Sequence, residues 1–113
     1  MPTITDRKTV RIRELNDEFR KTFRGGRVML TPGILSLPDA TRGDVIRRIS
    51  TFDEFNGACD PHGEHDFIAF ELGGSHIFAK IDYFAPDLEH GSEDPSDPTK
   101  TTRVMTIMTA GEY

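Results

Sequence analysis

Two alternating runs around a glycine pair, "DFIAFEL" and "SHIFAKIDYF" about Gly73-Gly74, constrain the fold of this chain more than any other feature. Apolar and polar residues alternate along both runs, as they do in strands that bury one face. A two-residue hairpin turn needs positive backbone φ angles, which glycine adopts readily. The sequence therefore predicts an antiparallel β-hairpin over residues 66–84, with Phe67 facing Lys80 and Phe70 facing Ile77.

Two helices are predicted before the hairpin. The first spans residues 6–24, starts at cap-type residues and stops at Gly25-Gly26, where the chain can turn out of a helix. The second spans residues 39–52. The apolar residues that fall at helical spacing in the two segments are Ile12, Leu15, Phe19, Phe23, Val45, Ile46, Ile49 and Phe52.

The remaining segments complete a sheet. Residues 27–31 indicate a short strand, whereas residues 33–38 are compatible with either a strand or a helical turn. Residues 85–100 form a long acidic loop with three prolines, and residues 101–110 return as a strand. The predicted fold is α+β, with two helices packed on one face of a three- to five-stranded antiparallel sheet.

The length of 113 residues fits one domain spanning residues 1–113. No apolar run is long enough to cross a membrane, and the first residues lack the apolar segment of a secretory signal. The single cysteine, Cys59, excludes an internal disulfide and suits a reducing compartment. We therefore expect a cytoplasmic protein.

Charge is divided unevenly along the chain. Residues 1–50 hold eleven Lys and Arg against six Asp and Glu, whereas residues 51–113 hold three against thirteen. The division is compatible with a basic layer packed on an acidic one, which we favour, and also with a bipolar surface that meets charged partners.

The stretch "DPHGEHDF" (residues 60–67) concentrates coordinating and proton-transferring side chains. The predicted hairpin register brings His65 opposite Asp82, with Lys80 as a neighbour. A carboxylate beside an imidazole orients the ring and raises its pKa. His65, Asp82 and Glu64 are accordingly the candidates for acid–base catalysis.

The same stretch contains candidate metal ligands. His62, His65, Asp66 and Asp82 offer nitrogen and oxygen donors of the kind that zinc or manganese accepts. The H-x-x-H spacing in a loop is a weak signal, however, and residues 60–63 equally predict a turn whose side chains bond their own backbone. With no recognisable serine nucleophile, no basic residue near Cys59 and no phosphate loop, an enzyme is the less favoured interpretation.

Two surfaces bear on macromolecular partners. Arginines on one flank of the first predicted helix are interrupted by acidic residues, so that a solvated, ion-paired face is favoured over a nucleic-acid site. The acidic loop suggests an imitation of nucleic acid, although such loops more often serve solubility. The residues concerned are Arg13, Arg20, Arg24, Arg27, Asp17, Asp87, Glu89, Glu93, Asp94 and Asp97.

At "GGRVMLTPGI", "DPHGEHDFIAFEL", "KIDYF" and "TTRVMTIM…EY" the chain resembles a small bacterial domain family of unknown function, often carried on plasmids or other mobile elements. The resemblance covers residues 8–113. It implies that the "DPHGEHDF" motif belongs to the family pattern and that an accessory role on a mobile element is plausible, but it implies no activity. The "NGACD" segment departs from the pattern, so the resemblance gives Cys59 no role.

The leading hypothesis from the sequence is a small accessory module that binds another macromolecule, a protein rather than a nucleic acid. The alternatives are a metal-dependent or histidine-based hydrolase that uses His62, Glu64, His65, Asp66 and Asp82, and an acidic nucleic-acid mimic. A symmetric dimer through an exposed strand edge is left open.

Overall fold

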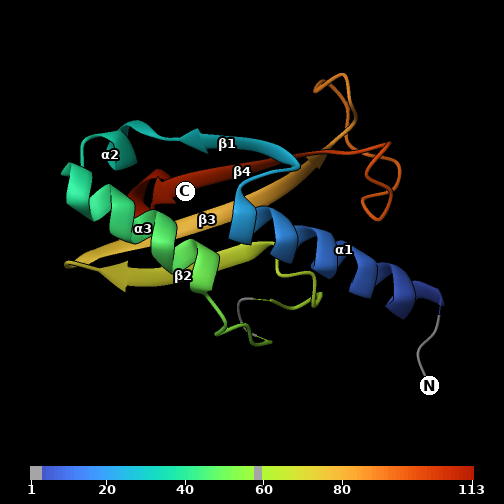
Figure 1. Cartoon of the computed structure of the whole chain (residues 1–113), viewed down its shortest axis with the longest axis horizontal. Coiled ribbons are helices and arrows are strands. Elements are labelled where there is room, and N and C mark those ends of the chain that lie inside the picture. The colour runs from blue at the N-terminus through green and yellow to red at the C-terminus, as the bar shows by residue number, and fades with distance from the viewer. Residues whose placement is uncertain (1–3, 58–59) are drawn as a thin grey trace.

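The computed structural model describes residues 4–57 and 60–113 (Figure 1). This part of the chain contains three α-helices and a four-stranded sheet, followed by a C-terminal 3-10 turn. The elements are α1 (Ile4–Thr22), β1 (Gly26–Leu30), α2 (Pro32–Leu35), α3 (Asp39–Thr51), β2 (Phe67–Leu72), β3 (Ser75–Phe84), β4 (Thr102–Thr109) and η1 (Ala110–Glu112). The predicted α+β class is confirmed.

The sheet has the strand order β1-β4-β3-β2. Strands β2, β3 and β4 pair antiparallel, whereas β1 runs parallel to β4. The expectation of a wholly antiparallel sheet is therefore wrong at one pair. A parallel pair needs a long crossover connection, which α2, α3 and the hairpin supply, and a five-residue run carries no signal of its direction.

The hairpin register follows the prediction. Phe67 pairs with Lys80 and Phe70 with Ile77, and the turn glycines have φ angles of 58° at Gly73 and 84° at Gly74. The alternation of side chains along β2 and β3 therefore sends one set of residues to each face of the sheet.

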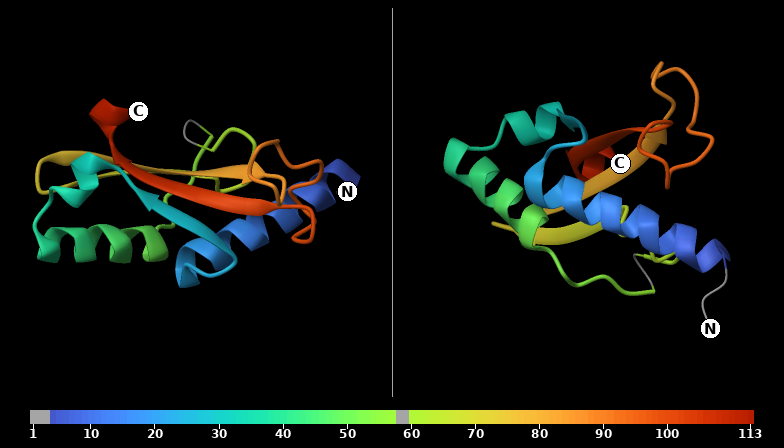
Figure 2. Two further views of the ribbon diagram at one scale, coloured as in Figure 1. Left: turned by 90° about the horizontal axis from the view of Figure 1, so that it is seen from above. Right: turned by 45° about the vertical axis from the view of Figure 1, so that its right-hand side comes forward.

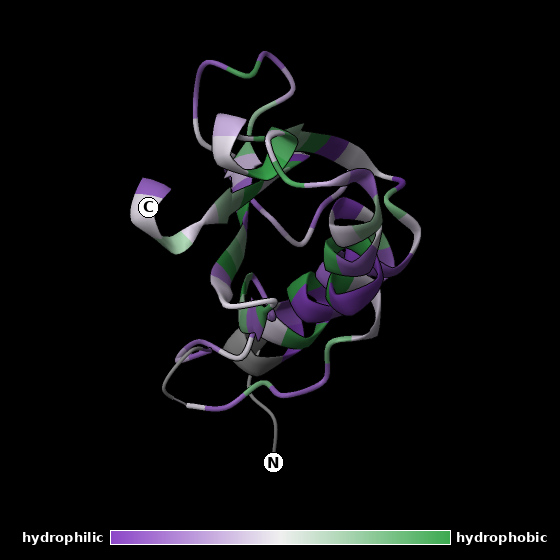
Figure 3. Cartoon of the chain, turned by 90° about the vertical axis from the view of Figure 1, so that its left-hand side faces the viewer, coloured by the Kyte–Doolittle hydropathy of each residue, from purple (hydrophilic) through white to green (hydrophobic). Residues whose placement is uncertain are grey.

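Helices α1 and α3 cover one face of the sheet, and the C-terminal turn lies on the other (Figure 2, left). The core forms between the helices and the covered face. Its members include Phe19 of α1, Val45 and Ile49 of α3, Ile68 and Phe70 of β2, Ile77, Ala79 and Ile81 of β3, and Met105 and Ile107 of β4. No described α-helix covers the far face, as the end-on view of the ribbon also shows (Figure 3), and side chains on that face are partly exposed.

Helix α1 ends slightly before the predicted position. Phe23 takes a left-handed backbone (φ 57°), which ends the helix ahead of Gly25-Gly26. A Cβ at Gly26 would lie 2.5 Å from the Arg103 carbonyl oxygen and 2.7 Å from Cζ of Phe19. Gly26 thus lets β1 start in close contact with both α1 and β4.

The ambiguous segment 33–38 begins as the one-turn helix α2, and the C-terminal turn is bonded to it. Glu112 accepts hydrogen bonds from the Thr31 hydroxyl (2.6 Å), the Gly33 amide (3.0 Å) and the Thr109 amide (2.9 Å). These bonds favour the charged carboxylate and lower the pKa of Glu112 to about 2. The chain end is thereby held beside the start of α2.

Candidate functional site

The first half of "DPHGEHDF" is a turn in the connection from α3 to β2. Asp60 is buried, its carbonyl accepts the Gly63 amide (3.2 Å), and its Oδ1 accepts the His65 amide (3.0 Å). Gly63 has a φ of 69°. The alternative interpretation of residues 60–63, a turn stabilised by its own side chains, describes this geometry.

His65 points to the helix side of the sheet. Its Nδ1 lies 2.9 Å from Oδ1 of Asp17 on α1, and its Nε2 lies 3.6 Å from Oδ2 of Asp60. The ring stacks on Phe55 with centroids 3.7 Å apart. Both ring nitrogens therefore face carboxylates, and one ring face is covered by an aromatic side chain.

The predicted pairing of His65 with Asp82 is wrong. His65 lies just before β2 with a left-handed backbone (φ 56°), which turns its ring toward α1 and away from the hairpin ladder. Asp82 lies on the uncovered face of β3, where its carboxylate is 3.4 Å from Lys80 Nζ. The sheet separates the two side chains, so the pocket expected at the open end of the hairpin does not form.

Glu64 belongs to a polar network around Asn16 that the sequence did not reveal. Asn16 Nδ2 donates to the Tyr83 hydroxyl (2.8 Å) and to the Glu64 carbonyl (3.0 Å), and Asn16 Oδ1 accepts from Arg103 Nε (2.7 Å). The Tyr83 hydroxyl in turn donates to Glu64 Oε1 (2.8 Å). The network joins α1, the "DPHGEHDF" loop, β3 and β4.

Burial and the Glu64 carboxylate keep the Tyr83 phenol protonated. Burial raises the pKa of the Tyr83 phenol, and the hydrogen bond to Glu64 raises it further. A phenol held neutral in this way acts as a donor throughout the physiological range. The arrangement is that of a satisfied internal network, since the donors and acceptors of Asn16 and Tyr83 are used within the protein.

One signal in the sequence could have indicated this network. Asn16 follows Ile12 by four positions and precedes Phe19 by three, which places an amide on the apolar face of the first helix. A buried amide requires partners for both its oxygen and its nitrogen. The partners themselves lie 48 to 87 residues further along the chain and are not identified by spacing.

Asp66 is half-buried beside the network. Burial raises the pKa of its carboxyl above the ordinary value, and repulsion by Glu64 adds to the effect. Because the ionised form is disfavoured in the folded state, Asp66→Asn should make the protein slightly more stable at pH 7, by less than ~1 kcal/mol after solvent screening. The gain should vanish below about pH 4, where both states carry a protonated carboxyl.

Urea unfolding of both proteins at pH 7 and pH 3.5 measures this difference. A variant less stable than the wild type at pH 7 would show that the Asp66 carboxylate has a favourable partner that outweighs its burial.

The predicted metal ligands do not converge within the described residues. His65 and Asp82 lie on opposite faces of the sheet, and His62 is exposed on the turn. The described residues whose donor atoms do lie within ligand range of one another are Asp87, Glu89 and His90, in the acidic loop and exposed. The Asp87 carboxylate already accepts hydrogen bonds from His90 and from two backbone amides. These bonds lower the pKa of Asp87 to about 2.

The other described residues that the sequence singled out are not members of the Asn16 network. Cys59 is outside the described residues. Arg20 is buried and paired with Asp17 (3.1 Å), and Arg13 donates to the Gly63 carbonyl (3.3 Å), so neither extends a free basic stripe along α1. In the acidic loop, Asp94 and Asp97 accept hydrogen bonds from neighbouring hydroxyls.

Comparison with known proteins shows the family. A model of the DUF3768 family, described as a protein of unknown function, matches residues 30–112, and the chain belongs to this family. No curated protein and no solved structure matches it. In the described part of the chain, no helix has the length and apolar character needed to cross a membrane.

Proposed function

We propose that this domain is a protein-binding module that holds an extended segment of its partner in a groove on the uncovered face of the sheet. The observation that carries the proposal is a hollow of about 290 Å³ on this face, at the side where β1 forms the edge of the sheet. It is lined by Arg27, Met29, Asp82, Phe84, Leu88, Val104 and Thr106.

The lining combines apolar walls with one available cation. Met29 is 59% exposed although it lies within β1, and Phe84, Leu88 and Val104 extend the apolar surface. Arg27 forms no ion pair with any residue that the structure describes, whereas Asp82 is paired with Lys80. The groove therefore offers a positive charge beside an apolar wall.

These properties favour an extended peptide with an acidic and an apolar side chain. No described strand pairs with the outer side of β1, so its backbone groups are available for strand addition. Side chains of an added strand alternate between faces, which would direct every second one toward the groove. Arg27 would pair with the carboxylate, and Met29 and Leu88 would contact the apolar residue.

Selection of random peptides displayed on phage, with the purified domain as bait, tests this proposal. Selected sequences should combine an acidic and an apolar residue two positions apart. Met29→Lys should weaken binding of such a peptide about tenfold or more, because it places a charge in the apolar wall. Leu35→Lys is the matched control, since Leu35 on α2 is similarly exposed (56%) but lies outside the groove.

Peptide affinity measured by fluorescence anisotropy compares the two variants. Equal losses in Met29→Lys and Leu35→Lys, or selected peptides without acidic residues that bind independently of Arg27, would contradict the proposed groove.

A further inference from the structure

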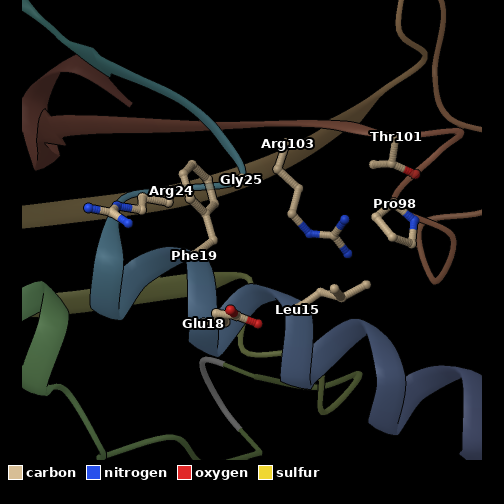
Figure 4. A pocket seen from close by; sticks show the side chains of 8 residues that line it. All are labelled: Leu15, Glu18, Phe19, Arg24, Gly25, Pro98, Thr101 and Arg103. Carbon is tan, nitrogen blue, oxygen red and sulfur yellow. The ribbon is translucent and has the colours of Figure 1, made fainter.

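A second hollow of about 220 Å³ lies on the helix side of the sheet, between α1, the start of β1 and the end of the acidic loop. Figure 4 shows Arg103 extending from β4 toward α1, with Leu15 beneath its guanidinium and Pro98 and Thr101 beside it. Phe19 and Gly25 close the far side, and Glu18 and Arg24 lie at the rim.

Arg103 is a buried cation without a carboxylate partner. It is 3% exposed. Its Nε donates to Asn16 Oδ1 (2.7 Å), its Nη2 donates to the Pro95 carbonyl (2.6 Å), and its guanidinium lies over the Tyr83 ring (5.2 Å). All of these partners are uncharged, and none of the described contacts uses Nη1.

The other buried arginine of the described chain shows the contrast. Arg20 is 4% exposed and pairs directly with the Asp17 carboxylate at 3.1 Å. Burying a charge without a counter-ion is costly, and such groups are normally paired. Glu64 is the carboxylate that attracts Arg103, and it does so from a distance while bonded to Tyr83. Arg103 thus combines a buried positive charge, a free nitrogen and an adjoining cavity.

We propose that this cavity is a binding site for a small monocarboxylate, whose carboxylate accepts from Nη1 of Arg103. Leu15, Phe19 and Pro98 provide apolar contacts for the remainder of the ligand. Glu18 and Arg24 place one charge of each sign at the rim, so Arg103 is the net cation of the lining and one carboxylate balances it. The volume suits a ligand the size of benzoate or a short-chain fatty acid.

Titration of the ¹⁵N-labelled full chain with benzoate, benzamide and inorganic phosphate, followed by amide chemical shifts, tests the site. Benzoate should cause saturable shifts at Leu15, Phe19, Gly25 and Thr101. Benzamide has the same shape without the charge and should bind about tenfold more weakly or not at all, since hydrogen bonds to charged groups are the stronger ones. Absence of saturable shifts at these residues, equal binding of benzamide, or tighter binding of phosphate would overturn the proposal.

Two variants test which charged side chains determine the affinity for benzoate. Arg103→Gln, where it remains folded, should lose benzoate binding by about tenfold or more. Glu18→Gln removes an exposed charge that has no ion pair with a described residue, and it should tighten binding of benzoate about two- to fivefold. If Arg103→Gln does not fold, the Glu18→Gln result decides, because unchanged or weaker binding in this variant contradicts a carboxylate at the proposed position.

Discussion

Replacing Asn16 with leucine should lower the free energy of unfolding by about 3–5 kcal/mol, although the two side chains have similar size. Asn16 is fully buried and uses both its amide nitrogen and its oxygen in the network. The substitution leaves the buried Arg103 Nε without its acceptor and the Glu64 carbonyl without its donor. Breaking the partner set of a buried charge is among the most destabilising single changes in proteins.

Urea unfolding monitored by circular dichroism measures the effect. Glu14→Leu is a matched control, because Glu14 lies on the exposed side of the same helix and its one ion pair among the described residues is with Arg11 (3.5 Å). Its effect should stay within about 0.5 kcal/mol. An Asn16→Leu protein as stable as the control would mean that the network does not contribute to folding.

The hairpin could be predicted from the sequence because the information is local. Apolar and polar residues alternate on both sides of Gly73-Gly74, and this alternation together with the glycine pair determines the turn, the register and the face of the sheet that each side chain occupies. The two long helices were likewise predictable from apolar spacing, with ends correct to about two residues at each terminus. Both kinds of pattern lie within a single segment of the chain.

The position of β1 in the sheet was not predictable in the same way. Its five residues show that a strand exists but not which neighbour it joins, and in the structure it pairs parallel with β4. The partners in this pair are 77 positions apart, so only the folded arrangement defines them.

The predicted pairing of His65 with Asp82 failed because of one backbone angle, the φ of His65. Extending the hairpin register by two residues assumed that the strand conformation continues to His65, whereas Asp60 binds the His65 amide and holds the residue in a left-handed conformation. Non-glycine residues seldom adopt this conformation, and although histidine does so more often than most, a histidine alone does not predict it. Because His65 leaves the ladder, its ring meets Asp17 and Phe55 instead of Asp82.

The "DPHGEHDF" motif has a structural role in the domain. His65 binds α1 through Asp17 and packs on Phe55, and Glu64 binds β3 through Tyr83. The motif thereby holds the connection from α3 to β2 against both layers of the domain. Its polar side chains supply hydrogen-bond partners to buried groups, whereas the ligand sites that we propose are the groove at Met29 and the cavity at Arg103.

Alanine substitutions at the two histidines of the motif test this structural role, because one ring is bonded within the domain and the other is exposed. His65→Ala removes an imidazole bonded to Asp17 at 2.9 Å and stacked on Phe55, and it should cost about 2–3 kcal/mol of unfolding free energy. His62→Ala changes an exposed side chain that forms no hydrogen bond with a described residue, and it should cost less than about 0.5 kcal/mol.

A third variant separates the effect of losing the imidazole ring from the effect of backbone strain at position 65. Asn tolerates the left-handed φ of 56° at position 65 better than alanine, so His65→Asn reports the loss of the ring contacts without added backbone strain. It should remain about 1.5 kcal/mol or more below the wild type, because asparagine cannot stack on Phe55.

The most direct test is the free energy of urea unfolding of the wild type, His62→Ala, His65→Ala and His65→Asn, measured side by side at pH 7. The structural role predicts a large loss in both position-65 variants and almost none in His62→Ala. Equal losses at the two histidines, or a His65→Asn protein as stable as the wild type, would contradict it.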